Sequence, residues 1–115
     1  MLHKVLDIFK NDCDRVNYIV AHNVTFDTNV VLAACYKTKI NVTFLKNKKK
    51  ICTMKSTTSL CKLPGKYGYK YPKLEELFIY LFHEKPDAIL HNSLEDAKVT
   101  LKCYKELIRL KIEMV

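Results

Sequence analysis

The sequence predicts an α/β fold in which parallel strands alternate with helices. Two short apolar runs of β-type residues, at 18–21 and 51–54, are separated by a stretch with helical periodicity, and further helical stretches precede and follow them. Strands that alternate with helices usually pair in parallel, because the helix carries the chain back across the sheet. With 115 residues, nearly half of them hydrophobic, the chain is long enough for one globular domain, residues 1–115.

The first half of the chain is expected to hold a helix, a strand and a second helix. The spacing of Leu2, Leu6 and Phe9 predicts an amphipathic helix that ends near Asn11, before a polar turn at residues 12–14. Residues 18–21 (YIVA) predict a buried strand. A helix then follows from about residue 25 to residue 37, and the residues on its apolar face are Phe26, Val30, Ala33 and Ala34. The pattern does not decide residues 38–50.

The second half is expected to hold a strand and two helices. Residues 51–54 (ICTM) predict the strand, and the glycines and prolines that follow predict a loop from 64 to 72. A helical stripe runs from Leu74 to Phe82, before Pro86. Asn92 and Glu95 have the spacing of a capping box, so the last helix is expected to start at 92–93. Its predicted apolar stripe is Leu94, Ala97, Leu101, Tyr104 and Ile108.

Positive charge is concentrated in the middle of the chain. The net charge is +8, and between Tyr36 and Lys73 there are eleven lysines and no acidic residue. Tyrosines are interleaved with these lysines, so the block would attract phosphates while the rings stack on unpaired bases. The alternative is a solvated lysine-rich face in a protein from a lysine-biased genome. On the first interpretation, the consecutive lysines that contact substrate are Lys48, Lys49 and Lys50.

The cysteines and the apolar runs bear on the cellular compartment. The five cysteines contain no C-x-x-C pair, which argues against a zinc ribbon or a disulfide framework and favours reduced thiols. No apolar run approaches the roughly 20 residues that span a bilayer, so no membrane partner is expected. We expect an intracellular location, cytoplasmic or nuclear, and the lysine bias is compatible with a large DNA virus or another AT-rich genome.

Two polar clusters sit where helices begin. In AHNVTFD, Asn23 is a natural N-cap and Asp27 falls in the first helical turn; in HNSLEDA, His91 precedes the helix and Asp96 lies in its first turn. Carboxylates near strand ends suit Mg²⁺ or Mn²⁺, and a histidine suits proton transfer from water. Acids in a first turn are also favoured by the helix dipole alone, by about 0.3–1 kcal/mol.

Taken together, the two clusters resemble the second and third motifs of a known nuclease family. HNVTFD resembles the H-N-x-x-F-D form of the second motif, and HNSLED fits the H-x-x-x-x-D third motif. The chain is thus similar to the DEDDh (DnaQ-like) 3′–5′ exonucleases of the ribonuclease H-like superfamily. YPKLEELFIYLF before the third motif agrees with this, and the resemblance extends from about Val16 to Ile108.

The resemblance implies a function and a set of roles. Asp27 and Asp96 would be metal-ligating carboxylates and His91 the general base. Two divalent ions, Mg²⁺ or Mn²⁺, would activate a water that attacks the terminal phosphodiester at a single-stranded 3′ end of DNA or RNA. Asn23 would cap its helix and contact substrate, and Phe26 would pack beneath the site. His22 receives no role beyond ending its strand.

The family's first motif, a D-x-E pair on the first strand, has no counterpart here. The resemblance therefore implies a ribonuclease H-like fold that is incomplete at the N-terminus, with the first three strands missing. Asp12 and Asp14 have a similar spacing but lie in a polar turn too close to the next strand. With two acids we expect weak, single metal occupancy and little turnover by this chain alone.

The missing strand would also leave the 18–21 strand with an unpaired edge, open to a complementing N-terminal fragment or to homo-association. The alternatives to a nuclease are a non-catalytic nucleic-acid-binding remnant that uses the lysine block, and a structural remnant without either activity.

Overall fold

Two parallel strands form the centre of the molecule and separate its helices into two groups. The computed structural model describes residues 2–86 and 93–115. Strand β1 (Tyr18–Ala21) pairs in parallel with β2 (Lys49–Cys52), from Tyr18 opposite Lys49 to Ala21 opposite Cys52. The predicted α/β class with parallel pairing is confirmed. That the fold is incomplete at the N-terminus, with the first three strands of a ribonuclease H-like domain missing, stays a prediction.

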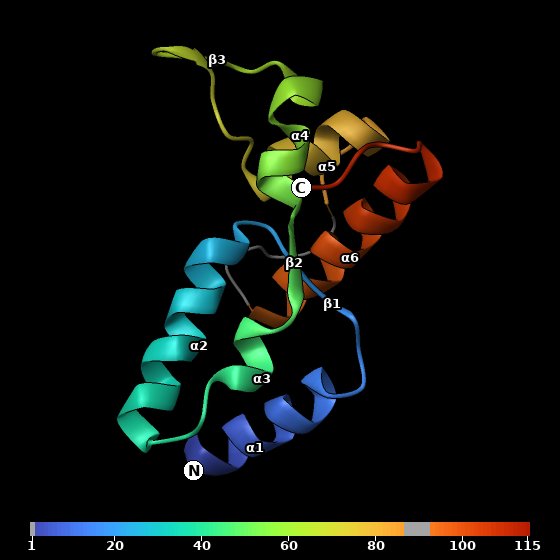
Figure 1. Ribbon diagram of the computed structural model, residues 1–115. Helices are drawn as coiled ribbons and strands as arrows, with labels where there is room; N and C mark the ends of the chain where they lie inside the picture. Colours follow the sequence, from blue (N-terminus) through green and yellow to red (C-terminus); the bar gives the residue numbers. More distant parts are fainter. Residues whose placement is uncertain (1, 87–92) are drawn as a thin grey trace.

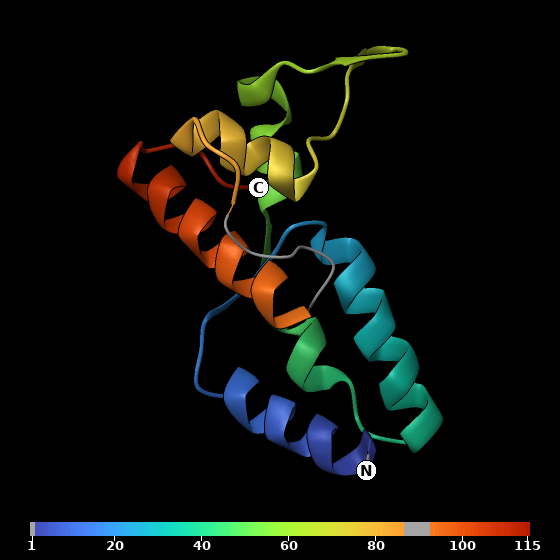
Figure 2. The ribbon, with the colours of Figure 1, turned by 180° about the vertical axis from the view of Figure 1, so that it is seen from behind.

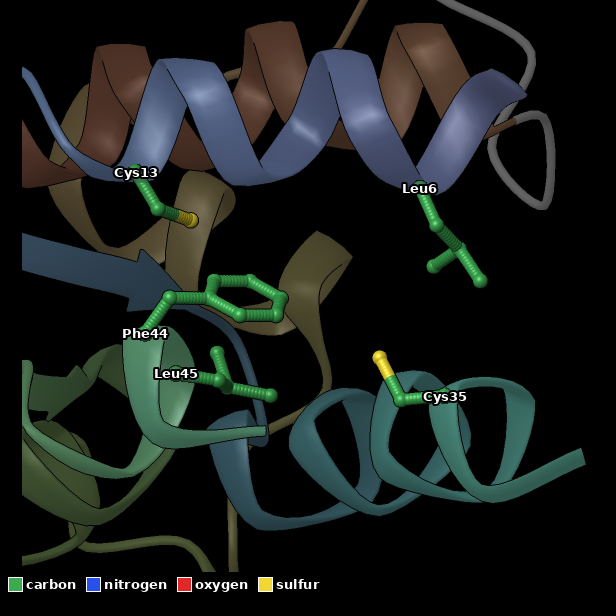
Figure 3. Packing of buried hydrophobic residues seen from close by; sticks show 5 residues of the cluster. All are labelled: Leu6, Cys13, Cys35, Phe44 and Leu45. Carbon is green, nitrogen blue, oxygen red and sulfur yellow. The ribbon is translucent and has the colours of Figure 1, made fainter. Parts of the chain in front are cut away.

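The first group of helices packs around one hydrophobic core. It consists of α1 (Leu2–Cys13), α2 (Val24–Thr38) and the short α3 (Thr43–Lys46). Figure 3 shows side chains from all three helices pointing into this core: Leu6, Cys13, Cys35, Phe44 and Leu45. The Phe9 and Phe44 rings meet edge to face with centroids 6.1 Å apart. Figure 1 shows these three helices together at one end of the molecule.

The second group of helices has its own core. It comprises α4 (Thr53–Cys61), α5 (Leu74–Phe82) and α6 (Ser93–Arg109). Leu77 and Phe78 of α5 are buried against Val99 and Cys103 of α6. Between α4 and α5 the chain forms a small hairpin of β3 (Pro64–Gly65) and β4 (Gly68–Tyr69), which projects away from the body in Figures 1 and 2. This hairpin lies inside the segment predicted as a loop.

Several predicted boundaries need correction. Helix α1 extends into the predicted polar turn and ends at Cys13, because Cys13 lies seven residues after Leu6 on the same face and is buried in the first core. Residues 53–54, predicted as strand, are the first turn of α4. This helix is rich in serine and threonine, whose hydroxyls bond to carbonyls four residues earlier, as Thr57 does to Thr53 at 2.7 Å. Such residues give a weak helical signal in a sequence.

The predicted apolar faces of two helices also need correction. In α2, the side chains packed against the core are Val31, Leu32, Ala34 and Cys35, whereas Phe26, Val30 and Ala33 are exposed. In α6, the buried residues are Val99, Thr100, Cys103 and Leu107, whereas Leu94, Leu101 and Ile108 of the predicted stripe are exposed. The Asn92 capping box lies outside the described residues.

Strand β1 is less buried than predicted. Tyr18 is exposed, and Ile19, Val20 and Ala21 are half-buried. Within the described residues, β1 pairs only with β2 and leaves its other edge open. None of the helices in the described ranges has the length and apolar character that crossing a membrane requires.

Candidate active site

A cavity of about 530 Å³ lies between the end of β1 and helix α6. Its wall includes both predicted metal-ligating aspartates, Asp27 and Asp96, although these come from segments far apart in the sequence. The remaining lining residues are Val20, Ala21, His22, Leu74, Ala97, Thr100, Leu101 and Tyr104. Ala97, Leu101 and Tyr104 belong to the predicted apolar stripe of α6, so part of that stripe faces this cavity.

A sharp turn after β1 places Asp27 at the cavity. The strand ends at Ala21 and α2 begins at Val24, so only His22 and Asn23 connect them. Asn23 occupies the predicted N-cap position in the left-handed conformation (φ 82°, ψ 60°), which asparagine tolerates better than most residues. Its side chain makes no cap hydrogen bond, so the predicted side-chain capping is wrong. Asp27 then falls in the first turn of α2, as predicted.

Asp96 reaches the cavity from the first turn of α6, as predicted. It is half-buried, and Thr100 one turn later donates a hydrogen bond to its backbone carbonyl at 2.8 Å. The predicted general base, His91, lies outside the described residues.

His22 is held on both ring nitrogens. Nε2 lies 2.7 Å from the carbonyl oxygen of Pro72, and Nδ1 lies 2.9 Å from Oγ1 of Thr53. Burial lowers the pKa of His22, an effect that the Pro72 hydrogen bond and the charge of Asp27 partly oppose. The imidazole is therefore neutral at pH 7 and supplies no full positive charge to the cavity. Nothing in the sequence indicated that His22 would bond to both Thr53 and Pro72, because a single histidine after a strand has no characteristic pattern.

The environment of Asp27 disfavours its ionised form. Asp27 is exposed as a residue, yet partial burial of its carboxyl group raises its pKa, and the nearby His22 partly lowers it. A carboxylate that has lost some hydration benefits from a cation. Phe26, predicted to pack beneath the site, is 63% exposed because α2 turns its other face inward.

The carboxylates of Asp27 and Asp96 provide oxygen donors, which are the type of ligand that a hard cation such as Mg²⁺ prefers. Mg²⁺ is commonly held by one or two carboxylates, with waters and substrate phosphates completing its shell. Within residues 2–86 and 93–115 there is no group of three or more histidine, cysteine, aspartate or glutamate side chains that could hold a metal ion. Asp12 and Asp14 do not line this cavity and are exposed at the end of α1.

The predicted substrate lysines lie at the other end of the sheet. Lys49 pairs with Tyr18, three residues before Ala21, which is about 10 Å along the strand. Lys48 donates to the carbonyl of Val16 at 2.8 Å, and Lys50 donates to the carbonyls of Leu45 and Lys48. The Lys49 ammonium lies 5.8 Å from the Tyr18 ring centroid. Their assignment to substrate stays a prediction.

The comparison with protein families decides which class of protein this is. The family model of RNase T, described as "Exonuclease", matches residues 2–104. The chain belongs to this exonuclease family. The comparisons with curated proteins and with solved structures gave no match.

Membership in the exonuclease family confirms the DEDDh (DnaQ-like) assignment within the ribonuclease H-like superfamily. It places the chain among nucleases, which hydrolyse nucleic acid, and the family generally uses divalent metals. The match begins at residue 2, so it includes helix α1, which precedes the region covered by the motif resemblance.

Proposed function

We propose that this chain is a 3′–5′ exonuclease domain, residues 1–115, in which Asp27 and Asp96 hold a divalent cation. The observation that carries the proposal is the shared cavity: two carboxylates from the first turns of α2 and α6 line one space of about 530 Å³. Both belong to the family's motifs, and both provide the oxygen donors that Mg²⁺ and Mn²⁺ prefer.

Each residue has a defined task in this proposal. Bound Mg²⁺ or Mn²⁺ supplies charge stabilisation at the scissile phosphate and lowers the pKa of the attacking water. Asp27 and Asp96 hold and orient the ion, and His91 accepts the proton of the water. His22 is engaged by Pro72 and Thr53, so it positions the turn before Asp27 and takes no proton. Asn23, at that turn, contacts the substrate strand.

The metal complement is expected to be incomplete in the isolated chain. Two carboxylates balance the charge of one divalent ion, and a second ion would need further acids. We therefore expect a single weak cation site and slow turnover. The two-metal mechanism of the family requires more carboxylates at this cavity.

A complementing polypeptide segment would supply those carboxylates. Strand β1 has an open edge within the described residues, and the cavity beside it carries apolar side chains such as Val20 and Leu101. An extended segment that pairs with β1 would satisfy its backbone groups and fill this space. A second copy is a poorer partner, because each chain carries a net charge of +8.

Cation binding by the isolated chain tests the assignment directly. Mn²⁺ titrated into the protein, followed by calorimetry, should bind at one site, and Asp27→Asn or Asp96→Asn should weaken binding on the order of tenfold or more. Asp12→Asn, an exposed acid away from the cavity, is the matched control and should bind as the wild type does. Equal affinities for all three variants would refute the site.

Hydrolysis is tested with a 3′-labelled single-stranded oligonucleotide. Release of labelled mononucleotide should require Mn²⁺ or Mg²⁺, stop with EDTA, and be lost in the Asp27→Ala and Asp96→Ala variants. Release from a 5′ end instead would contradict the polarity. Binding without metal-dependent hydrolysis, even with a complementing segment, would favour the non-catalytic nucleic-acid-binding module.

Complementation is tested with a synthetic peptide that alternates valine with polar residues and carries an Asp-x-Glu pair. The peptide should raise the Mn²⁺ affinity of the wild-type chain, whereas the same peptide with Asn-x-Gln should not. Light scattering run in parallel reports homo-association. A dimer, or an acidic peptide without effect, would contradict this part of the proposal.

A further inference from the structure

The hairpin of β3 and β4 presents a lysine and a tyrosine at its tip. Pro64 pairs with Tyr69 and Gly65 with Gly68, so the connection consists of Lys66 and Tyr67 alone. Figures 1 and 2, which view the molecule from opposite sides, both show this hairpin extending away from the helices. The tip residues are therefore displayed to solvent, away from both hydrophobic cores.

Both glycines of the sequence are used to build this tight tip. Gly68 has φ +123°, a conformation that residues with a side chain rarely adopt. A Cβ at Gly65 would lie 2.8 Å from the carbonyl oxygen of Gly68, closer than real contacts allow. The rest of the chain contains no other glycine. The backbone is thus specifically suited to a narrow two-residue turn at Lys66 and Tyr67.

Three tyrosines at alternate positions are exposed along the hairpin and the segment that follows it. Tyr67 is 92% exposed, and Tyr69 and Tyr71 are each 56% exposed. The ammonium of Lys66 lies 5.5 Å from the centroid of the Tyr67 ring. Burial of these rings contributes little to folding, since most of their surface stays in water. Their positions instead offer three flat faces to a ligand.

The three exposed tyrosines, Tyr67, Tyr69 and Tyr71, form a tyrosine track whose C-terminal end is connected to the wall of the cavity. Pro72, the residue after Tyr71, accepts the hydrogen bond from His22. His22 and Leu74 both line the cavity, as Asp27 does. Rings at alternate positions of an extended chain lie about 7 Å apart, roughly twice the spacing of stacked bases, so one base fits between neighbouring rings. A strand whose end enters the cavity would be within reach of these rings.

The charge around the track suits a polyanion. Residues 28–74 contain no acidic side chain. Lys70 is paired with Glu76 at 2.9 Å, whereas Lys62, before β3, and Lys66, in the hairpin turn, are exposed cations. Lys48 and Lys50, in contrast, already donate to backbone carbonyls. Lys49 and the exposed Tyr18 also combine a cation with a ring, but at the end of the sheet away from the cavity. The Lys66–Tyr67 pair lies on the segment that reaches the cavity through Pro72 and His22.

We infer that the hairpin holds single-stranded nucleic acid, with Tyr67, Tyr69 and Tyr71 stacking on successive unpaired bases and Lys62 and Lys66 contacting the phosphates. The choice of nucleic acid as ligand rests on the proposed function. The hairpin would be a second substrate-binding element, outside the metal site. It would bind the strand and take no part in bond cleavage. Base–aromatic stacking tolerates any sequence, because every base has a π face.

Binding can be measured separately from hydrolysis. Fluorescence anisotropy of a labelled oligothymidylate or oligouridylate is followed in EDTA, where no cleavage occurs. Tyr67→Ala and Tyr69→Ala should each weaken binding on the order of tenfold, and Tyr67→Phe should retain it. Tyr36→Ala is the matched control, since Tyr36 is exposed to nearly the same extent as Tyr69 and is flanked by a lysine but lies on α2.

Salt dependence tests the lysines. Lys66→Gln should reduce the slope of log affinity against log salt by about 0.7, the value for one phosphate contact on a single strand. Replacing Lys48, Lys49 and Lys50 together by glutamine should change the slope less than replacing Lys62 and Lys66 together.

The hairpin proposal is overturned if the wild type does not bind single strands, if Tyr67→Ala binds as tightly as Tyr67→Phe, or if Tyr36→Ala loses as much affinity. These results are independent of the Mn²⁺ titrations. Loss of the hairpin proposal would appear as failed strand binding with normal Mn²⁺ binding. Loss of the metal-site proposal would appear as failed Mn²⁺ binding with normal strand binding.

Discussion

His22 donates a hydrogen bond from Nε2 to the carbonyl oxygen of Pro72 over 2.7 Å. A carbonyl can only accept, so Nε2 carries the proton, and in the neutral ring Nδ1 accepts from the hydroxyl of Thr53. A single side chain thus joins the end of β1 to the start of α4 and to the segment before α5. Two of these connected regions, the end of β1 and the chain around the start of α5, contribute lining residues to the cavity of the candidate active site.

Removal of this imidazole should destabilise the protein. His22→Ala removes the hydrogen bond to the Pro72 carbonyl and leaves the buried Thr53 hydroxyl with only a 3.4 Å hydrogen bond to the carbonyl of Ala21, which should cost about 1–3 kcal/mol in the free energy of unfolding. Urea unfolding followed by circular dichroism measures the change. His83→Ala, at the C-cap of α5, is the control and should cost less.

The contribution of His22 to stability should depend on pH. Its folded-state pKa is lowered below 6.5, so the stabilisation is complete above that pH, where both states are neutral. As the pH falls below 6.5 the unfolded state takes up the proton first, and stability is lost. The difference between wild type and His22→Ala should shrink accordingly. A constant difference across this range would contradict a neutral His22.

Two leucines of α6 should respond differently to truncation. Leu107 is fully buried, so Leu107→Ala should lower the free energy of unfolding by about 2–5 kcal/mol. Leu101 is 51% exposed at the cavity, and Leu101→Ala should cost less than about 1 kcal/mol. Urea denaturation measures both. A larger loss of stability in Leu101→Ala than in Leu107→Ala would instead support the apolar face predicted from the sequence.

Asp27→Asn should separate cation binding from folding. Desolvation raises the folded-state pKa of Asp27, so its ionisation disfavours the folded state as the pH rises above 3.8; the helix dipole opposes this effect. The variant should therefore differ from wild type by less than about 0.5 kcal/mol without metal.

With Mn²⁺ at one hundred times its dissociation constant, the wild type should gain about 2.7 kcal/mol. At the same Mn²⁺ concentration Asp27→Asn should gain much less, as thermal unfolding would show. An equal gain in both proteins would place the cation elsewhere. Asp12→Asn, with its acid outside the cavity, should gain as the wild type does.

The thiols should react in order of exposure. Cys13, Cys35, Cys52 and Cys103 are buried, and Cys61 is half-buried. Burial raises the pKa of Cys103 to about 12, and burial with the charge of Glu76 raises that of Cys61. In the native protein one thiol should react with a disulfide reagent, slowly, and the others only in urea. Mass spectrometry identifies the site; simultaneous labelling of several cysteines would contradict this burial pattern.

The sequence predicted secondary structure correctly where the conformation of a segment depends on residues close to it in the chain. The strand at 18–21 and helix α5 follow from local patterns, and both are confirmed. The two aspartates could be paired only through the family motifs, because no local signal indicates that the starts of α2 and α6 lie at one cavity.

Predictions failed where tertiary packing chose between two local options. Helix α6 carries two apolar stripes, and the one chosen from the sequence faces the cavity and solvent, whereas Cys103 and Leu107 fill the interior. The hydroxyl-rich α4 was missed because its threonines weaken the helical signal. The assignment of Lys48 and Lys50 to substrate rests on charge alone and stays a prediction; charge does not reveal that both side chains donate to backbone carbonyls.

The division of the interior into two separate clusters has a mechanical consequence. One cluster joins α1, α2 and α3, and the other joins α5 and α6. Between the two groups of helices lie β1 and β2, which are joined by four residue pairs. Hydrogen exchange should then resolve two cooperative unfolding units, each with its own opening free energy. Because Asp27 and Asp96 come from opposite units, the opening of either unit would separate the two carboxylates that line the cavity.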